Sequence, residues 1–222
     1  MERQTAWWWG GMRGTGRVRR IVMVLAVVGL GLLARAPAGL AADGPAGGWS
    51  ERVLGNPDAP VTLTEFSSLT CPHCARFHAE TLAQIKTNFI DTGKVKLVYW
   101  DFPLDRVAVQ AATLARCVPP ERYFAMLEMM FANQASWSRA KDPVAALRKY
   151  TRLVGLEDAA ADACLADQSL LMTLLQRVQE AQARFGIEST PTFIINNDKN
   201  KRIDGARPYA DFAASLTGAG AQ

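Results

Sequence analysis

Histidine and cysteine are scarce in this sequence of 222 residues, which holds two histidines and four cysteines. So few cysteines exclude a small domain held together mainly by disulfides. Charged residues make up 21% of the chain and hydrophobic residues 49%, a balance that excludes a disordered chain. The apolar run at residues 21–33 is too short to span a bilayer comfortably, which argues against a multi-pass membrane protein. What remains is a globular protein with a sizeable core.

The formal net charge is +4, but the excess of basic residues lies at one end of the chain. Residues 1–41 hold six arginines and one acid, and the rest has 19 basic and 20 acidic residues. A nearly neutral remainder offers no net positive charge for phosphate backbones, so nucleic acid is not an expected partner.

The N-terminal segment has the order of a secretory signal: arginines, then the apolar run, then small residues up to Ala41 and Ala42. We expect a signal peptide over residues 1–41, cleaved near Ala41 or Ala42, then a flexible leader over 42–50 and one domain over 51–222. The alternative is an uncleaved anchor. Export would place the cysteines in an oxidising compartment, where thiols pair.

Two of the four cysteines are close together, in the tetrapeptide Cys71-Pro72-His73-Cys74. Residues 61–66, rich in β-branched side chains, predict a strand before it, and apolar residues at helical spacing over 75–90 predict a helix after it. The proline suits the first position of that helix. Because the free N–H groups and dipole at a helix start stabilise an anion, we expect a reactive thiolate at Cys71.

The residue types around the pair favour thiol redox chemistry over metal binding. His73 can donate a hydrogen bond to the Cys71 sulfur or add charge when protonated, and a disulfide whose reduced form is stabilised is a strong oxidant. Haem attachment is excluded because Ala75, not histidine, follows the second cysteine. A zinc site on the two cysteines and His78 lacks a fourth ligand, so no metal is expected and His78 is interpreted as an ordinary, partly buried histidine.

The rest of the chain predicts a strand over 95–101 and helices over about 107–185, one capped by Asp142 and the last ended by Gly186. Short strands near 192–195 and 202–203, with a polar turn at 196–200 between them, and a helix over 209–216 follow. The order is β-α-β, a block of helices, then β-β-α. This α/β pattern resembles the thioredoxin fold with an all-helical insertion after its second core strand.

Three stretches resemble the DsbA family of thiol:disulfide oxidoreductases: residues 55–61, Glu65-Phe66 ahead of the cysteine pair, and residues 189–193. The resemblance implies a periplasmic enzyme without a cofactor. Such an enzyme donates its Cys71–Cys74 disulfide to reduced exported polypeptides through a mixed disulfide at Cys71. A membrane quinone-linked partner, similar to DsbB, would then reoxidise the pair.

The resemblance also implies a role for each matching residue. Cys71 would be the exposed nucleophile and Cys74 its buried partner. Pro191 would be a cis-proline facing the Cys71 sulfur, with Thr190 offering backbone hydrogen bonds to an extended client. Glu65 matches the family's acid beneath the active site, where it would manage the proton of Cys74; a surface carboxylate at a strand end is the alternative.

Two features depart from the simplest family pattern. The sequence gives no clear counterpart of a lysine that partners Glu65, although Lys96 is on the neighbouring strand. Cys117 and Cys164 resemble the second, non-catalytic disulfide of some members, and two free buried thiols are the alternative.

Two other functions stay open at this stage. One is an isomerase or reductase kept reduced, because a threonine before the proline, as at Thr190, is shared with isomerases. The other is a client-binding, chaperone-like module without turnover. Dimeric periplasmic isomerases carry an N-terminal dimerisation domain, and residues 42–50 are too few to form one, so we expect a monomeric oxidase.

Overall fold

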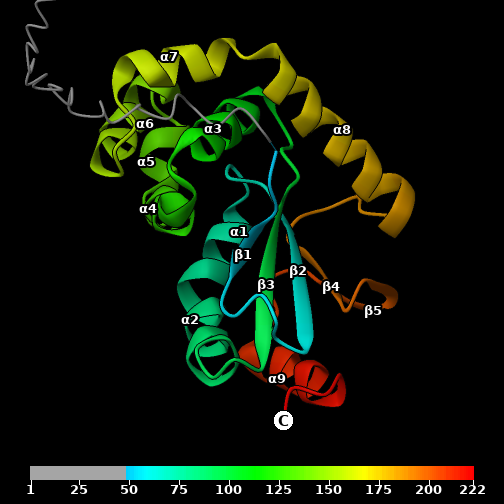
Figure 1. Ribbon diagram of the computed structural model, residues 1–222. Coiled ribbons are helices and arrows are strands. Elements are labelled where there is room, and N and C mark those ends of the chain that lie inside the picture. The colour runs from blue at the N-terminus through cyan, green and yellow to red at the C-terminus, as the bar shows by residue number, and fades with distance from the viewer. Residues whose placement is uncertain (1–48) are drawn as a thin grey trace, which may run out of the picture. The chain divides into compact units, whose positions relative to one another are not determined.

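The computed structural model describes residues 49–222, in which five strands form one mixed sheet in the order β1-β3-β2-β4-β5 (Figure 1). Their bounds are β1 (Arg52–Leu54), β2 (Val61–Ser67), β3 (Val95–Asp101), β4 (Thr192–Ile195) and β5 (Asp198–Asp204). β2 and β3 are parallel, and the other neighbours are antiparallel. The predicted β-α-β and β-β-α units are confirmed. The expected signal peptide and most of the leader lie outside the described residues.

Two details of the sheet differ from the sequence-based expectation. The three-residue β1 adds an antiparallel edge strand beside β3, and no strand was predicted there. The polar turn expected at 196–200 is shorter, because Asn196 and Asn197 both have positive φ, 53° and 57°. Asparagine tolerates this conformation, and two such residues suffice for a tight hairpin turn.

A helical segment begins at Pro72, as predicted, with four residues between it and the end of β2. It contains two wider, π-helical turns, and its parts are α1 (Pro72–Arg76), η1 (Phe77–Thr81), α2 (Leu82–Ile85) and η2 (Lys86–Ile90). The cysteine pair therefore lies where β2 ends and a helix begins.

The helical insertion follows β3, and α9 ends the domain. The insertion comprises α3 (Arg106–Cys117), η3 (Pro120–Arg122), α4 (Tyr123–Ala132), α5 (Gln134–Ser138), α6 (Pro143–Leu153), α7 (Asp158–Ala166) and α8 (Gln168–Phe185). The last helix is α9 (Tyr209–Gly218). Asp142 caps α6 by accepting a hydrogen bond from the Ala145 N–H, and Gly186 ends α8 with a φ of 63°, so both predicted boundaries are confirmed.

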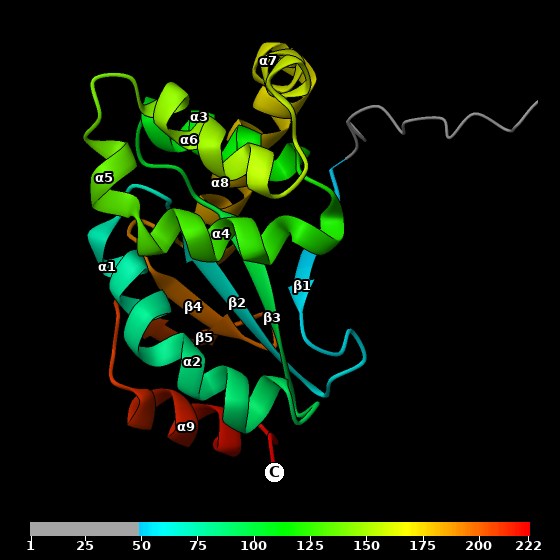
Figure 2. The ribbon, with the colours of Figure 1, turned by 90° about the vertical axis from the view of Figure 1, so that its left-hand side faces the viewer.

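Helices cover both faces of the sheet (Figures 1 and 2). On one face, the helix that starts at Pro72 and α9 pack through Phe77 and Phe212 onto Phe193. On the other face, α8 contributes Phe185, which packs with Trp100 of β3. The insertion has its own core, which is continuous with the loop that carries the cysteines. None of the helices in residues 49–222 is long and apolar enough to cross a membrane.

Candidate active site

The two cysteines of the motif differ sharply in their surroundings. Cys71 caps the N-terminus of α1 with an extended backbone, φ −77° and ψ 120°, and keeps 7% exposure. Cys74, one turn into the helix, is fully buried. Only Cys71 is therefore accessible to another protein. Its exposed fraction is lower than expected for the exposed nucleophile that the sequence predicted.

The reduced Cys71 is built to carry a negative charge. A hydrogen bond from the Cys74 thiol is the largest effect that lowers the pKa of Cys71, to about 5 from 9.0. Thr190 and the backbone N–H groups of Cys74 and His73 lower this pKa further, and burial opposes them. The thiolate expected at the helix start is thus favoured by specific donors as well as by the helix dipole.

His73 takes part through its backbone in this arrangement. Its side chain is exposed at the surface, and its N–H is among the groups that lower the pKa of Cys71. The sequence-based expectation placed this role on the imidazole, so the structure adds a contribution that requires no particular side chain.

Cys74 has the opposite character. Burial is the largest effect that raises its pKa well above the usual value, followed by the Cys71 sulfur and the negative charge of Glu65. Ser67, at the end of β2, lowers it. One thiol of the pair is therefore ready to react, and the other holds its proton.

Glu65 lies in β2 with 0% exposure, which contradicts the surface-carboxylate alternative. Its Oε1 and the Nε2 of His78 share a hydrogen bond of 3.0 Å. Lys96 does not reach this acid; its Nζ donates to the Pro57 carbonyl at 2.6 Å. His78 is thus the partner of Glu65, for which the sequence showed no clear lysine. The signal in the sequence was spacing, since Cys74 and His78 are four residues apart and share a helix face.

The loop before β4 closes the site from the opposite side. The Thr190–Pro191 peptide bond is cis, and the Cys71 Sγ lies 3.3 Å from the Thr190 carbonyl oxygen, to which it donates a hydrogen bond when it is protonated. These two residues from the far end of the chain therefore meet the cysteine motif.

Sequence reasoning also missed Gln134 of α5. Its buried side-chain Nε2 donates to the Leu69 carbonyl at 2.8 Å and to the Cys71 carbonyl at 2.9 Å. The insertion therefore fixes the backbone of the loop that carries the nucleophile. No local pattern marks this glutamine, because its partners are more than 60 residues away in sequence.

The other two cysteines form a disulfide within the insertion. Cys117 ends α3 and Cys164 lies in α7, with Cα atoms 6.2 Å apart. This bridge joins two helices of the insertion and has no direct part in the active site. In residues 49–222, no three His, Cys, Asp or Glu side chains cluster in a way that could hold a metal ion.

The pKa of Cys71 leads to a first prediction. Alkylation of the reduced protein by iodoacetamide should be half-maximal near pH 5, because the thiolate is the reactive form. The rate at Cys71 is measured by mass mapping across a pH series, with Cys74→Ala as a second sample. Alanine removes the side-chain donor that lowers the pKa of Cys71 most, so the midpoint of this variant should move upward. A midpoint near 9.0 in the unsubstituted protein would contradict the stabilised thiolate.

Comparison with known proteins agrees with this geometry. The family model described as thioredoxin matches residues 49–217. A protein named as a protein-disulfide oxidoreductase in Rickettsia bellii is 28% identical over 148 residues, 66% of this chain and 57% of the relative. One in Rickettsia prowazekii is 28% identical over 74% of this chain and 61% of the relative. The chain thus spans less than two thirds of the length of these curated relatives.

Solved structures give a fuller match. Wolbachia pipientis alpha-DsbA1 superposes with a TM-score of 0.70 and 30% identity, over 76% of this chain and 90% of that one. A protein-disulfide isomerase from Novosphingobium aromaticivorans superposes with a TM-score of 0.64 and 25% identity, over 76% and 96% of the two chains. With its helical insertion, paired cysteines and cis-proline, the chain belongs to the thioredoxin family and, within it, to the DsbA-like proteins.

Proposed function

We propose that this chain is a protein disulfide oxidoreductase that donates its Cys71–Cys74 disulfide to reduced exported polypeptides. The observation that carries the proposal is the contrast between the two thiols. Cys71 has a pKa lowered to about 5, and burial raises that of Cys74 well above its usual value. The reduced pair is therefore stabilised as one thiolate and one thiol, and a stabilised reduced form makes the disulfide a strong oxidant.

The pH dependence of the disulfide's oxidising strength follows from the direction in which the pKa of Cys71 is shifted. The pKa of Cys71 lies below the 9.0 of an ordinary thiol, so ionisation stabilises the reduced protein increasingly above about pH 5. That stabilisation is complete above about pH 9 and is lost as the pH falls through 5. At neutral pH the disulfide is thus more oxidising than one between ordinary thiols.

The proposed transfer moves two electrons from the client to the pair. A client thiolate attacks the Cys71 sulfur, the Cys71–Cys74 bond breaks, and Cys74 leaves with the electron pair and takes up a proton. A second client thiolate then attacks the client sulfur of the mixed disulfide. Cys71 leaves as its stabilised thiolate, and the client carries a new disulfide.

The position of the Thr190 carbonyl beside the Cys71 sulfur supports the assignment of Thr190 and Pro191 to client binding. Backbone groups beside the Cys71 sulfur are suited to pair with an extended peptide, as an edge strand does. We propose that Glu65 accepts and returns the proton of Cys74, because its buried negative charge raises the pKa of that thiol. Cys117 and Cys164 are assigned a structural role only.

The compartment and partners belong to the same proposal. The order of charged, apolar and small residues in 1–41 supports export and cleavage near Ala41 or Ala42, to the periplasm. The mature N-terminus, read by mass spectrometry, tests it; a chain that still begins at Met1 or Met12 would reject cleavage. A monomer reoxidised by a membrane quinone-linked, DsbB-like partner completes the proposed cycle.

The deciding experiment compares two activities of the same protein on ribonuclease. We expect the oxidised chain to restore activity to reduced ribonuclease quickly, and the reduced chain to unscramble a mispaired one slowly. Strong unscrambling with weak oxidation would favour the isomerase alternative, which Thr190 and the likeness to the Novosphingobium protein-disulfide isomerase support. Client binding without any redox turnover would instead favour the chaperone-like module.

A further inference from the structure

The two carboxylate oxygens of the buried Glu65 have different surroundings. Oε1 of Glu65 bonds His78, and Oε2 is buried with no hydrogen-bond partner in the described part of the chain. Glu65 acts electrostatically on Cys74, the thiol that must gain and lose a proton in each proposed cycle. A carboxylate with one free and one bonded oxygen can accept a proton at the first and pass one on from the second.

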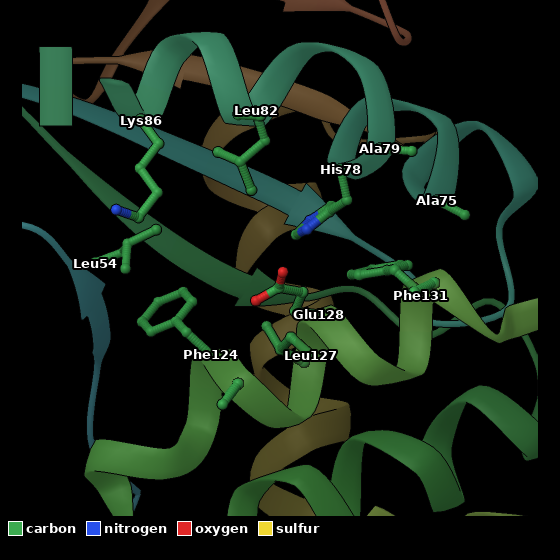
Figure 3. Close-up of a pocket in the computed structure, with 13 residues that line it drawn as sticks. Leu54, Ala75, His78, Ala79, Leu82, Lys86, Phe124, Leu127, Glu128 and Phe131 are labelled. Atoms are coloured by element: carbon green, nitrogen blue, oxygen red, sulfur yellow. The ribbon is translucent and has the colours of Figure 1, made fainter. Parts of the chain in front are cut away.

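His78 connects this buried acid to solvent. It lies on η1, its side chain is 9% exposed, and its ring stacks on Phe131 of α4 with 4.0 Å between ring centroids. The same side chain lines a groove of about 440 Å³ between the helix that starts at Pro72 and α4 (Figure 3). Its ring thus touches Glu65 with one nitrogen and borders a space large enough for water and small bases.

Imidazole is suited to such a position, because it accepts and releases protons near neutral pH and has two nitrogens on different sides of the ring. A lysine would hold the charge of Glu65 in place without exchanging protons readily at this pH. A histidine as the partner of Glu65 therefore allows the buried pair to exchange protons, which a lysine would not.

We infer that His78 is the proton exit of the active site, passing protons between Glu65 and the groove as Cys74 ionises and is reprotonated. The inference rests on the proposed function, whose redox steps involve Cys74. When a mixed disulfide on Cys71 is resolved, the Cys74 proton goes to Glu65, then through His78 to solvent. The Cys74 thiolate then attacks the Cys71 sulfur and expels the bound thiolate. His78 acts through Glu65 and is a positioning residue.

The charged and titratable groups around His78 come from each element packed against it. Glu65 faces it from β2, and Tyr99 of β3 lies with its ring centroid 6.4 Å away. Glu128 of α4 and Lys86 at the end of the same helical segment line the same groove (Figure 3). The Nζ of Lys86 donates a hydrogen bond of 2.6 Å to Asp91. The imidazole of His78 is hydrogen-bonded to Glu65, which is therefore its direct partner.

The test follows one turnover with a chemical oxidant. Reduced protein is mixed with oxidised glutathione, quenched in acid, and its glutathione adduct is counted by mass spectrometry. Adduct formation requires only the Cys71 thiolate, and adduct decay requires Cys74 to lose its proton. His78→Ala should form the adduct at the unsubstituted rate and lose it about 100-fold more slowly, a typical loss for a missing acid–base group. Its decay should also rise with hydroxide concentration.

Chemical rescue separates proton transfer from packing. Imidazole added to His78→Ala should speed the decay, and pyrazole, a ring of the same size but a far weaker base, should not. Leu82→Ala is the matched control, since it widens the same groove and leaves His78 intact; its decay should match the unsubstituted rate. If His78→Ala does not fold, His78→Gln keeps a donor to Glu65 without titrating near neutral pH and should decay as slowly.

Two results would overturn the inference. The first is adduct decay at the unsubstituted rate in the His78 variants. The second is equal acceleration by imidazole and pyrazole, which would assign the ring a space-filling role. Neither result touches the proposed function, which is tested separately by the oxidation of reduced ribonuclease with the unsubstituted protein.

Discussion

Cys71→Ser is expected to reduce the oxidation of ribonuclease to the uncatalysed rate. A serine hydroxyl cannot form the disulfide that is donated, and nothing else in the described site replaces the sulfur that the client attacks. Fluorescence and thermal unfolding should show a folded protein, because serine fits the space of the cysteine. Ribonuclease activity regained over time is the readout.

Cys74→Ser is the complementary substitution, and its expected effect separates the roles of the two cysteines more clearly than Cys71→Ser does. This variant keeps the Cys71 thiolate but cannot resolve a mixed disulfide from within. Covalent complexes with clients, reversible by a reducing agent, should therefore accumulate in cells that express it and be absent with Cys71→Ser. Complexes formed equally by both variants would mean that Cys71 is not the residue that forms the mixed disulfide.

Replacing both Cys117 and Cys164 with alanine is expected to cost about 4 kcal/mol of unfolding free energy. The bridge joins residues 47 apart, and the chain-entropy model gives this figure for a loop of that length. For a domain of this size the loss corresponds to a fall of about 8–16 °C in Tm. Disulfide donation should continue at temperatures where the variant stays folded, because the bridge joins α3 to α7 and the reactive pair lies at the start of α1.

Thermal unfolding without reductant measures this effect, with the single variant Cys117→Ala as a control for the loss of one side chain. Because the bridge needs both sulfurs, the single and double variants should lose a similar amount. An unchanged Tm in both variants, or alkylatable thiols at both positions in the unsubstituted protein, would contradict a structural bridge.

Local sequence patterns located much of the fold. The β-branched run before Cys71, Pro72 at the helix start, the aspartate cap at Asp142 and Gly186 each carry a signal within a few residues of the boundary they set. β1 escaped prediction because three residues are too few to show an alternating pattern.

The site itself depends on contacts that local patterns do not contain. The pairing of Glu65 with His78 needs the register between β2 and the helix that follows, and Lys96 could not be assigned to a side of its strand without that register. Gln134 bonds the active-site loop from the helical insertion. Helical spacing from Cys74 was the one signal that could have selected His78, whose expected role was only that of a partly buried histidine.

The central claim is that this protein gives its disulfide away, and the redox state of Cys71 and Cys74 in the cell tests it most directly. Cells expressing the full chain are quenched with acid, free thiols are labelled, and the pair is read by mass spectrometry. A donor of disulfides that is reoxidised by a membrane partner should be found predominantly oxidised. A pair found predominantly reduced would contradict the account and identify an isomerase or reductase instead.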